Sequence, residues 1–235
     1  SQSVIDYVTI SSSGGANDFG DLTEAKDFGA ACNSNVRGVY GGGQKDPGYL
    51  TDIEFVIIQS TGEASKFGDL TQARLGLGAG SSPTRAVFGG GSESPLNNLL
   101  LIDFIEIETG GTAVKFGDLS VGRHYVSGIS NSTRALFAGG VTPTTVNTID
   151  FITIATTGNA TDFGDMTVAA RGLHEGSATT STRGLLVSGK HDSGYYNVIN
   201  FVTFSTAGDA TDFGDTTGLV SYGGAISDTN GGLAR

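Results

Sequence analysis

Five aspartates are the residues that first invite a chemical interpretation, because each of them ends the tripeptide Phe-Gly-Asp. The tripeptides begin at residues 19, 67, 116, 163 and 213, so one unit recurs at intervals of 47 to 50 residues along the 235-residue chain. Carboxylates can bind metals or transfer protons, but one active site needs an asymmetric arrangement of groups. A group that recurs in every copy indicates a structural role.

Four arginines recur almost as regularly as these aspartates. We predict that each aspartate accepts hydrogen bonds from an arginine or from turn amides, because charge-assisted pairs can order a turn. The phenylalanines are expected to pack between sheets. The predicted structural set is Phe19, Asp21, Arg37, Phe67, Asp69, Arg85, Phe116, Asp118, Arg134, Phe163, Asp165, Arg183, Phe213 and Asp215.

Few other residues could do chemistry. None of the histidines at positions 124, 174 and 191 has a His or Cys neighbour at the spacing of zinc ligands. There is no nucleophile-elbow motif, although a Ser-His-Asp site assembled in space stays an alternative. The run at residues 41–43 is followed by no Gly-Lys-Ser/Thr sequence, so it is not a phosphate loop. We expect no enzymatic activity, no metal site and no cofactor.

The composition argues against two classes of partner. The formal net charge is −11 and no basic run occurs, which disfavours nucleic acid and anionic membranes. No apolar run approaches the roughly 18 residues of a membrane span, and the Ser1-Gln2-Ser3 start has no signal-peptide character. We therefore expect no membrane insertion. The lone Cys32 allows no intramolecular disulfide, which leaves the cellular compartment open.

Each unit contains four short extended segments and no helical period. The first, as in residues 53–58, is β-branched and aromatic, which suits a strand packed on both faces. A turn leads to the Phe-Gly-Asp segment, and then to a Gly/Ala-rich segment whose small residues would fit where sheets crowd together. The fourth segment, as in residues 85–88, ends in glycines. Four strands per unit are typical of a propeller blade, and a β-solenoid is the alternative.

The units resemble kelch repeats. A double glycine, the Asp/aromatic strand after it and an arginine (Arg74, Arg123, Arg171) follow in kelch order over the whole chain, with Phe where kelch units usually have Trp. The near-identical sequences of the units also resemble those of repeat proteins of marine bacteriophages, especially cyanophages. That resemblance implies a structural or tail-associated protein located in the virion.

The two ends of the chain are in matching phase. The chain begins at the first segment of a unit and stops at residues 231–235, where a glycine-ended segment finishes. If the last two strands pair with the first two, a ring closes and no sheet edge is exposed. We therefore predict one all-β domain over residues 1–235, a five-bladed β-propeller of four-stranded blades closed by its N- and C-terminal strands.

The copies differ most in the connection after the glycines, and in a propeller these connections share one face. Loops on a rigid scaffold are a usual place for binding, and their tyrosines could stack on a sugar or anchor a protein. Unselected drift of the loops is the alternative. An apolar loop with Leu96, Leu99 and Leu100 suggests contact with another chain, or packing onto its own blade. The candidate binding residues are Lys45, Asp46, Tyr49, Glu93, Asn97, His191, Tyr195 and Tyr196.

These observations predict a non-enzymatic binding module that acts through the variable-loop face. It would be a phage virion structural or host-attachment protein, with other virion proteins or a host surface glycan or protein as partner. A carbohydrate-binding, lectin-like propeller is the alternative.

Overall fold

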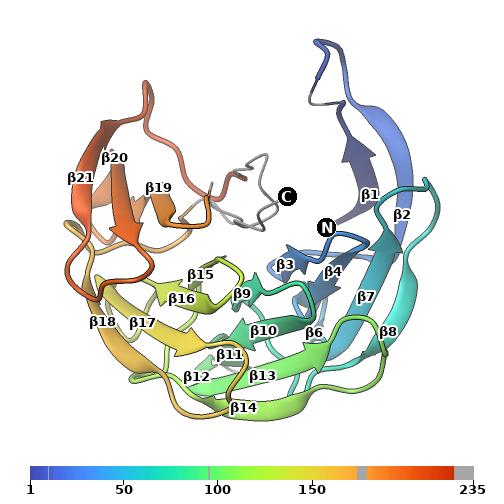
Figure 1. The fold of residues 1–235 in the computed structure, drawn as a ribbon, viewed down its shortest axis with the longest axis horizontal. Helices are drawn as coiled ribbons and strands as arrows, with labels where there is room; N and C mark the ends of the chain where they lie inside the picture. Colours follow the sequence, from blue (N-terminus) through green and yellow to red (C-terminus); the bar gives the residue numbers. More distant parts are fainter. Residues whose placement is uncertain (10, 95, 174–178, 225–235) are drawn as a thin grey trace.

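The structure is a computed structural model that describes residues 1–9, 11–94, 96–173 and 179–224. These residues form β-strands and no helix, so the predicted all-β class is confirmed. Five antiparallel sheets follow one another along an arc, accompanied by two small hairpins (Figure 1). The described strands do not close the arc, and the opening lies between β1–β2 and β19–β21.

The sheets are numbered here in chain order. The first pairs β1 (Gln2–Tyr7) with β2 (Asn17–Lys26). The second contains β3 (Ala30–Asn33), β4 (Arg37–Gly41), β7 (Asp52–Ile57) and β8 (Ser65–Asp69). The third contains β9 (Gly78–Ser81), β10 (Arg85–Gly89), β13 (Leu101–Glu106) and β14 (Val114–Asp118). The fourth contains β15 (Ser127–Ser130), β16 (Arg134–Ala138), β17 (Thr148–Thr153) and β18 (Thr161–Asp165). The fifth contains β19 (Arg183–His191), β20 (Gly194–Thr203) and β21 (Thr211–Asp215).

Each four-stranded sheet combines the last two segments of one repeat with the first two segments of the next. The hairpins β5 (Gln44–Lys45)–β6 (Gly48–Tyr49) and β11 (Ser92–Glu93)–β12 (Asn97–Asn98) interrupt the second and third sheets at this repeat boundary. The C-terminal strands that we predict to complete the first sheet fall largely within residues 225–235, outside the described residues.

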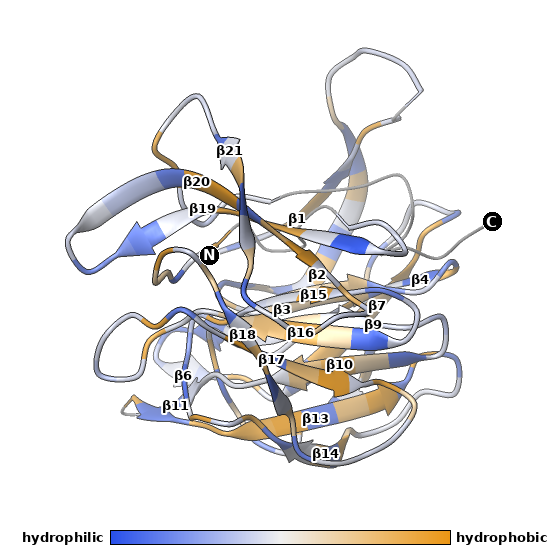
Figure 2. Cartoon of the chain, turned by 60° about the vertical axis from the view of Figure 1, so that its left-hand side comes forward, coloured by the Kyte–Doolittle hydropathy of each residue, from blue (hydrophilic) through white to orange (hydrophobic). Residues whose placement is uncertain are grey.

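The hydrophobic core lies between neighbouring sheets. Ile53 from the second sheet, Phe88 from the third and Ile107 immediately after β13 are fully buried in one cluster. Two similar clusters follow along the arc. Strands β10, β13 and β16 are largely orange in Figure 2, which marks hydrophobic residues. The repeat therefore buries each sheet against its neighbours rather than within itself.

The Gly/Ala-rich segments form β3, β9 and β15, which lie beside one another at the inner edges of their sheets (Figure 1). A Cβ atom on Gly128 would lie 2.0 Å from the carbonyl oxygen of Ala79 in the neighbouring sheet. Only glycine allows this approach of two backbones. The prediction that small residues fit where sheets crowd together is confirmed.

The Phe-Gly-Asp segments lie in the outer strands β2, β8, β14, β18 and β21. In the third sheet, the carbonyl oxygens of Phe116 and Asp118 accept hydrogen bonds from the N–H groups of Gly158 (2.9 Å) and Ala160 (2.8 Å) in the fourth. A Cβ on Gly117 would lie 2.1 Å from the Gly158 carbonyl oxygen, so glycine is required there as well. The tripeptide therefore joins one sheet to the next mainly through its backbone.

The predicted pairing of arginines with these aspartates is wrong. In the described part of the chain, no hydrogen bond or ion pair joins the two sets. The reason is position, since Arg85 pairs in register with Glu106 at one end of β13 whereas Asp118 pairs with Leu101 at the other. The Asp118 carboxylate instead binds the Lys115 ammonium at 2.9 Å.

The arginines serve a different structural role. The guanidinium carbon of Arg85 lies 4.8 Å from the ring centroid of Phe104, and that ring packs edge-on against Phe116. Its Nη1 donates to the carbonyl oxygen of Ala155 in the next sheet at 3.0 Å. Arg37, Arg134 and Arg183 stack in the same way over Phe55, Phe151 and Phe201. The expected burial of the Phe-Gly-Asp ring holds at Phe67, Phe116 and Phe163.

Buried ion pairs join the sheets closer to the centre. Arg74 contacts Asp103 and Arg123 contacts Asp150, each at 3.0 Å and with both side chains fully buried. Burial lowers the pKa of both guanidinium groups, and the partner aspartate opposes this shift. Lys26 and Glu54 form the equivalent pair between the first and second sheets. Arg171 is not the third member of this arginine series, since it pairs with Asp192 at the protein surface (3.3 Å).

Candidate binding face

Connections between strands alternate between two faces of the molecule, because every sheet is antiparallel. The loop face carries the connections that follow β4, β10, β16 and β19. It consists of hairpins β5–β6 and β11–β12, residues 141–147, and the tip of β19–β20. In Figure 2, β6, β11 and the β19–β20 tip all lie on the left, so the variable connections share one side of the molecule.

The bases of the first three connections have one backbone geometry. Gly42 and Gly43 have φ values of 69° and 99°, and the glycine pairs 90–91 and 139–140 are within a few degrees of them. A Cβ on Gly43 would lie 2.5 Å from the Asp27 carbonyl oxygen. Glycine is therefore needed at the base, whereas the sequence is free to vary beyond it.

The predicted binding residues lie on three separate hairpins of this face. Lys45 forms an ion pair with Glu24, and Glu93 accepts from the Asn97 side chain at 2.6 Å. Asp46 is exposed and Tyr49 is half-buried. No hydrogen bond or ion pair between described residues joins hairpins β5–β6 and β11–β12 to hairpin β19–β20, which carries His191, Tyr195 and Tyr196. The predicted set shares a face but does not form one pocket.

The two tyrosines of hairpin β19–β20 have different surroundings. Tyr195 is 52 % exposed, and the Lys190 ammonium lies 5.3 Å from its ring centroid. Tyr196 is partly buried, which raises the pKa of its hydroxyl, and that hydroxyl has no partner among the described residues. Tyr195 is therefore the tyrosine of this hairpin that a ligand can reach.

Three aromatic residues that the sequence interpretation did not assign to the site meet beside the loops. Phe28, Tyr125 and Tyr222 occupy the same repeat position in the first, third and fifth copies, and we call them the aromatic cluster. Their ring centroids are 5.6, 5.8 and 6.5 Å apart. Phe28 is 39 % and Tyr222 47 % exposed, so a ligand can contact them.

The second and fourth copies have Gly76 and Gly172 at this position. A Cβ on Gly172 would lie 2.6 Å from the Tyr222 ring, so a larger residue cannot fit beside each aromatic one. The alternation Phe, Gly, Tyr, Gly, Tyr is visible in the sequence. It was the signal that could have identified the cluster.

Phe28 and Tyr125 of the aromatic cluster precede the inner strands β3 and β15 by two residues, next to the bases of the loop hairpins. Their neighbours Asp27 and His124 form isolated β-bridges with Gln44 and Val141 at the bases of two variable connections. His124 Nδ1 lies 2.7 Å from Asn98 Oδ1 on the second hairpin. Burial and then nearby Arg171 lower the pKa of His124, and burial and then Tyr222 raise that of Tyr125. Exposed rings are thus surrounded by fixed polar groups.

The loops are also tied to one another. The Asn98 side chain donates to the carbonyl oxygens of Val141 and Thr142 at 3.2 and 3.0 Å. The Thr145 N–H donates to the Asp192 carboxylate at 3.0 Å. Hydrogen bonding from Thr145 is the main cause of the lowered Asp192 pKa. Three consecutive connections are therefore linked into one surface.

Among the described residues of the loop face, His191 and Ser193 contact each other within a local turn. His191 Nδ1 lies 2.9 Å from Ser193 Oγ and accepts from the Ser193 N–H at 3.2 Å. A Ser-His-Asp arrangement needs a carboxylate on the histidine, but Asp192 faces Thr145 and Arg171 instead. Nor does the described part of the chain contain a group of three or more His, Cys, Asp or Glu that could hold a metal ion.

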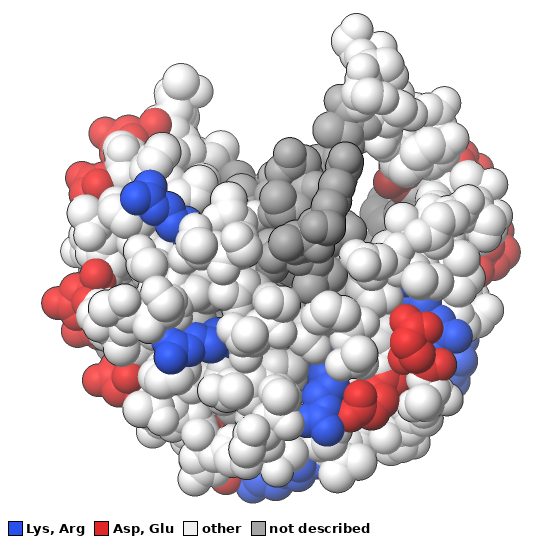
Figure 3. Space-filling view, in the orientation of Figure 1, with Lys and Arg blue, Asp and Glu red and all other residues white. Residues whose placement is uncertain are grey.

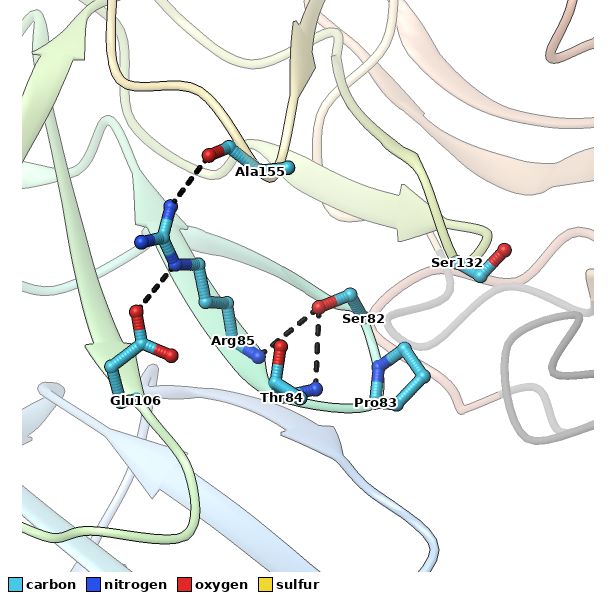
Figure 4. Close-up of a pocket in the computed structure, with 7 residues that line it drawn as sticks. All are labelled: Ser82, Pro83, Thr84, Arg85, Glu106, Ser132 and Ala155. Atoms are coloured by element: carbon cyan, nitrogen blue, oxygen red, sulfur yellow. Dashed lines mark hydrogen bonds and ion pairs between the residues drawn. The ribbon is translucent and has the colours of Figure 1, made fainter.

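In the described part of the chain, the opposite face offers fewer polar groups that are free to bind a ligand. A depression there is lined by Ser82, Pro83, Thr84, Arg85, Glu106, Ser132 and Ala155 (Figure 4). Among its described lining residues Arg85 is the one cation, and it is held by Glu106 and the Ala155 carbonyl. Basic side chains on the side shown in Figure 3 are separated from one another rather than joined in a patch.

No protein-family model and no curated protein matches this chain. Within the described residues, no helix has the length and apolar character needed to cross a membrane.

Proposed function

We propose that this chain is a non-enzymatic binding module that recognises its partner through the loop face. One observation carries the proposal: connections of different sequence stand on glycine bases of one geometry, around exposed aromatic rings. Constant framework and variable loops on one face are the arrangement expected of a recognition surface. The partner we propose is another virion protein or a host surface glycan or protein, in a phage tail or host-attachment assembly. The resemblance to marine phage repeat proteins supports that setting.

We further propose that the five sheets are the blades of a kelch-like β-propeller. The first sheet has two strands where the second, third and fourth have four. Its β1 residue Val4 is 57 % exposed, and Ile5 is only half-buried, whereas the equivalent Ile53 of β7 is fully buried. Because the described residues supply no inner strands to the first sheet, we propose that the C-terminal segments of the chain pair there.

Carbohydrate is the alternative ligand, and the aromatic cluster is the observation that favours it. Aromatic rings offer apolar faces to sugar rings, and hydroxyl and amide groups beside them can accept sugar hydrogen bonds. The Tyr125 and Tyr222 hydroxyls, Asn98 and exposed Tyr195 supply such groups on the loop face.

The proposal is tested by binding of the labelled protein to arrays of bacterial surface glycans and to intact marine cyanobacterial cells. We expect Tyr195→Ala to reduce binding at least tenfold, and Thr84→Ala on the opposite face to leave it unchanged. Equal loss from both substitutions would contradict recognition by the loop face. Glycan binding would select the lectin alternative, and cell binding without glycan binding would select a protein partner.

A further inference from the structure

Every pair of neighbouring sheets along the arc is joined by the same backbone contact. One half of this contact is present at each end of the arc. In four junctions, the Phe-Gly-Asp strand of one sheet docks its backbone on a Gly-X-Ala turn of the next sheet. The glycine N–H donates to the Phe carbonyl oxygen at 2.7, 3.2, 2.9 and 2.6 Å, and the alanine N–H donates to the Asp carbonyl oxygen at 2.8 Å each time. The turns are residues 62–64, 111–113, 158–160 and 208–210. This repetition defines the shape of both halves.

The fifth Phe-Gly-Asp has the docking shape without a docked turn. Gly214 has φ 140°, the same as Gly164. A Cβ on Gly164 would lie 2.5 Å from the Gly208 carbonyl oxygen, but no described atom lies within 4 Å of the same position on Gly214. Phe213 is 59 % exposed, whereas Phe163 is 3 % exposed. Strand β21 therefore presents an apolar and hydrogen-bonding edge that no described residue occupies.

The matching turn lies at the other end of the arc, between β1 and β2. Residues 14–16 read Gly-Gly-Ala and precede Phe19 at the spacing by which residues 208–210 precede Phe213. Ala16 is exposed, whereas Ala64, Ala113 and Ala210 of the occupied turns are buried. Both apolar members of the missing contact are thus in solvent.

A second group of the fifth sheet, Arg183 in β19, points to the same neighbouring sheet. Arg37, Arg85 and Arg134 each donate Nη1 to a carbonyl oxygen of the following sheet. Arg183 stacks over Phe201 as the others stack over their phenylalanines, with its guanidinium carbon 5.1 Å from the ring centroid. No acceptor for Arg183 in a following sheet lies within the described residues.

We propose that Phe213-Gly214-Asp215 docks on residues 14–16 of the same chain and forms the outer latch of the opening. The Phe213 carbonyl oxygen accepts from the Gly14 N–H, and the Asp215 carbonyl oxygen accepts from the Ala16 N–H. The occupant is the chain's own turn because both halves border the same opening in Figure 1. An intramolecular partner is also present at a high effective concentration. The latch concerns the two ends only, so its failure would leave the proposed loop-face binding untouched.

Cross-linking at two equivalent positions tests the latch in the full chain. In the Cys32→Ser background, Gly15→Cys is combined with Asp215→Cys. The control combines Asp209→Cys with Asp165→Cys, where the Asp165 N–H lies 3.0 Å from Asp209 Oδ1. With a short bis-maleimide in dilute solution, we expect similar yields of intramolecularly linked monomer from both pairs. A linked control with an unlinked 15–215 pair, or covalent dimers from that pair, would overturn the proposal.

Tryptophan emission gives a second readout, because the natural chain contains no Trp. We expect Phe213→Trp to emit at the short wavelength of a buried ring, close to Phe163→Trp. The Gly214→Ala change added to Phe213→Trp should shift this emission to longer wavelength, since the new Cβ would strike the turn. Emission of Phe213→Trp at the wavelength of a solvent-exposed indole, unaltered by Gly214→Ala, would overturn the latch even if neither cysteine pair reacts.

Discussion

The junction between the second and third sheets and the junction between the fourth and fifth place the same bonds in different electrostatic settings. In the first of them, the Asp103 carboxylate accepts from the Thr71 N–H at 3.1 Å and from its hydroxyl at 2.7 Å. In the other, the Asn200 side-chain oxygen accepts from Thr167 in the same two ways, at 3.0 and 2.6 Å. The acceptor is thus constant, and only its charge differs.

The cation differs in step with the acceptor. Arg74 contacts Asp103, whereas the repeat position of Arg74 is occupied by Ala170 in the copy that faces Asn200, and both of these residues are neutral. A buried charge is tolerated when its partner is present and is costly when the partner is missing. The comparison teaches that the hydrogen bonds to threonine are the common requirement, and that the ion pair is kept or lost as a unit.

The largest effect is expected from breaking the charged junction on one side. Asp103→Asn leaves Arg74 buried without a counter-ion, which should lower the free energy of unfolding by about 3–5 kcal/mol. Urea unfolding followed by circular dichroism measures the change. The same substitution at the partly exposed Asp52, which pairs with Lys66, should have a small effect. Equal losses at the two positions would contradict the interpretation.

The neutral junction can be given the wrong charge. Asn200→Asp places a carboxylate in a buried site without a cation, so its folded pKa should rise above the unfolded value near 3.9. An increase of about two units corresponds to about 2.7 kcal/mol. Because the charged form is the disfavoured one, stability should be retained below about pH 4 and lost as the pH rises toward the raised pKa. Unfolding at pH 4 and pH 7 measures the difference.

A rescue variant serves as the control for that prediction. Ala170→Arg combined with Asn200→Asp copies the charged junction and should remove most of the pH dependence. If the double variant keeps the full pH dependence, an arginine at position 170 does not act as the counter-ion of the carboxylate at position 200.

Copying the neutral junction into the charged one should cost less than the sum of its parts. The double variant Arg74→Ala, Asp103→Asn removes both charges, so a double-mutant cycle should give a favourable coupling of about 1–3 kcal/mol. The cavity left by Arg74 is common to the single and double variants. Additive losses would mean that the two side chains stabilise the junction independently.

The smallest effect on stability is expected on the loop face. Tyr195→Ala removes an exposed ring and should alter the free energy of unfolding by less than about 0.5 kcal/mol. Thermal unfolding checks this prediction beside the binding assays proposed above. A large loss of stability would assign Tyr195 to the framework and remove the contrast between constant junctions and variable loops.

Several elements of the fold follow from local pattern alone. The Phe-Gly-Asp period and the runs of small residues each predicted a strand of the unit, because strand propensity and the need for space act within a few residues. The structure places these strands at the outer and inner edges of the sheets. The predicted pairing of the recurring arginines with the Phe-Gly-Asp aspartates failed for a geometric reason. In the third sheet, Arg85 and Asp118 lie at opposite ends of β13 once each strand is placed.

The candidate site was only partly accessible to such reasoning. Variation among copies identified the four connections, since comparison of repeats needs no structure. The aromatic cluster was missed because Phe28, Tyr125 and Tyr222 come together only when three sheets bring their inner edges side by side. No local rule relates residues almost a hundred positions apart.

The sequence by itself determined the repeat, the strands, the glycine-dependent turns and the acidic, all-β character of the protein, because these depend on composition and on contacts between near neighbours. Tertiary structure decided which basic residue meets which carboxylate, which phenylalanines are buried and which rings face the loops. Each of those outcomes depends on how one sheet packs against the next, which contacts between near neighbours in the sequence do not specify.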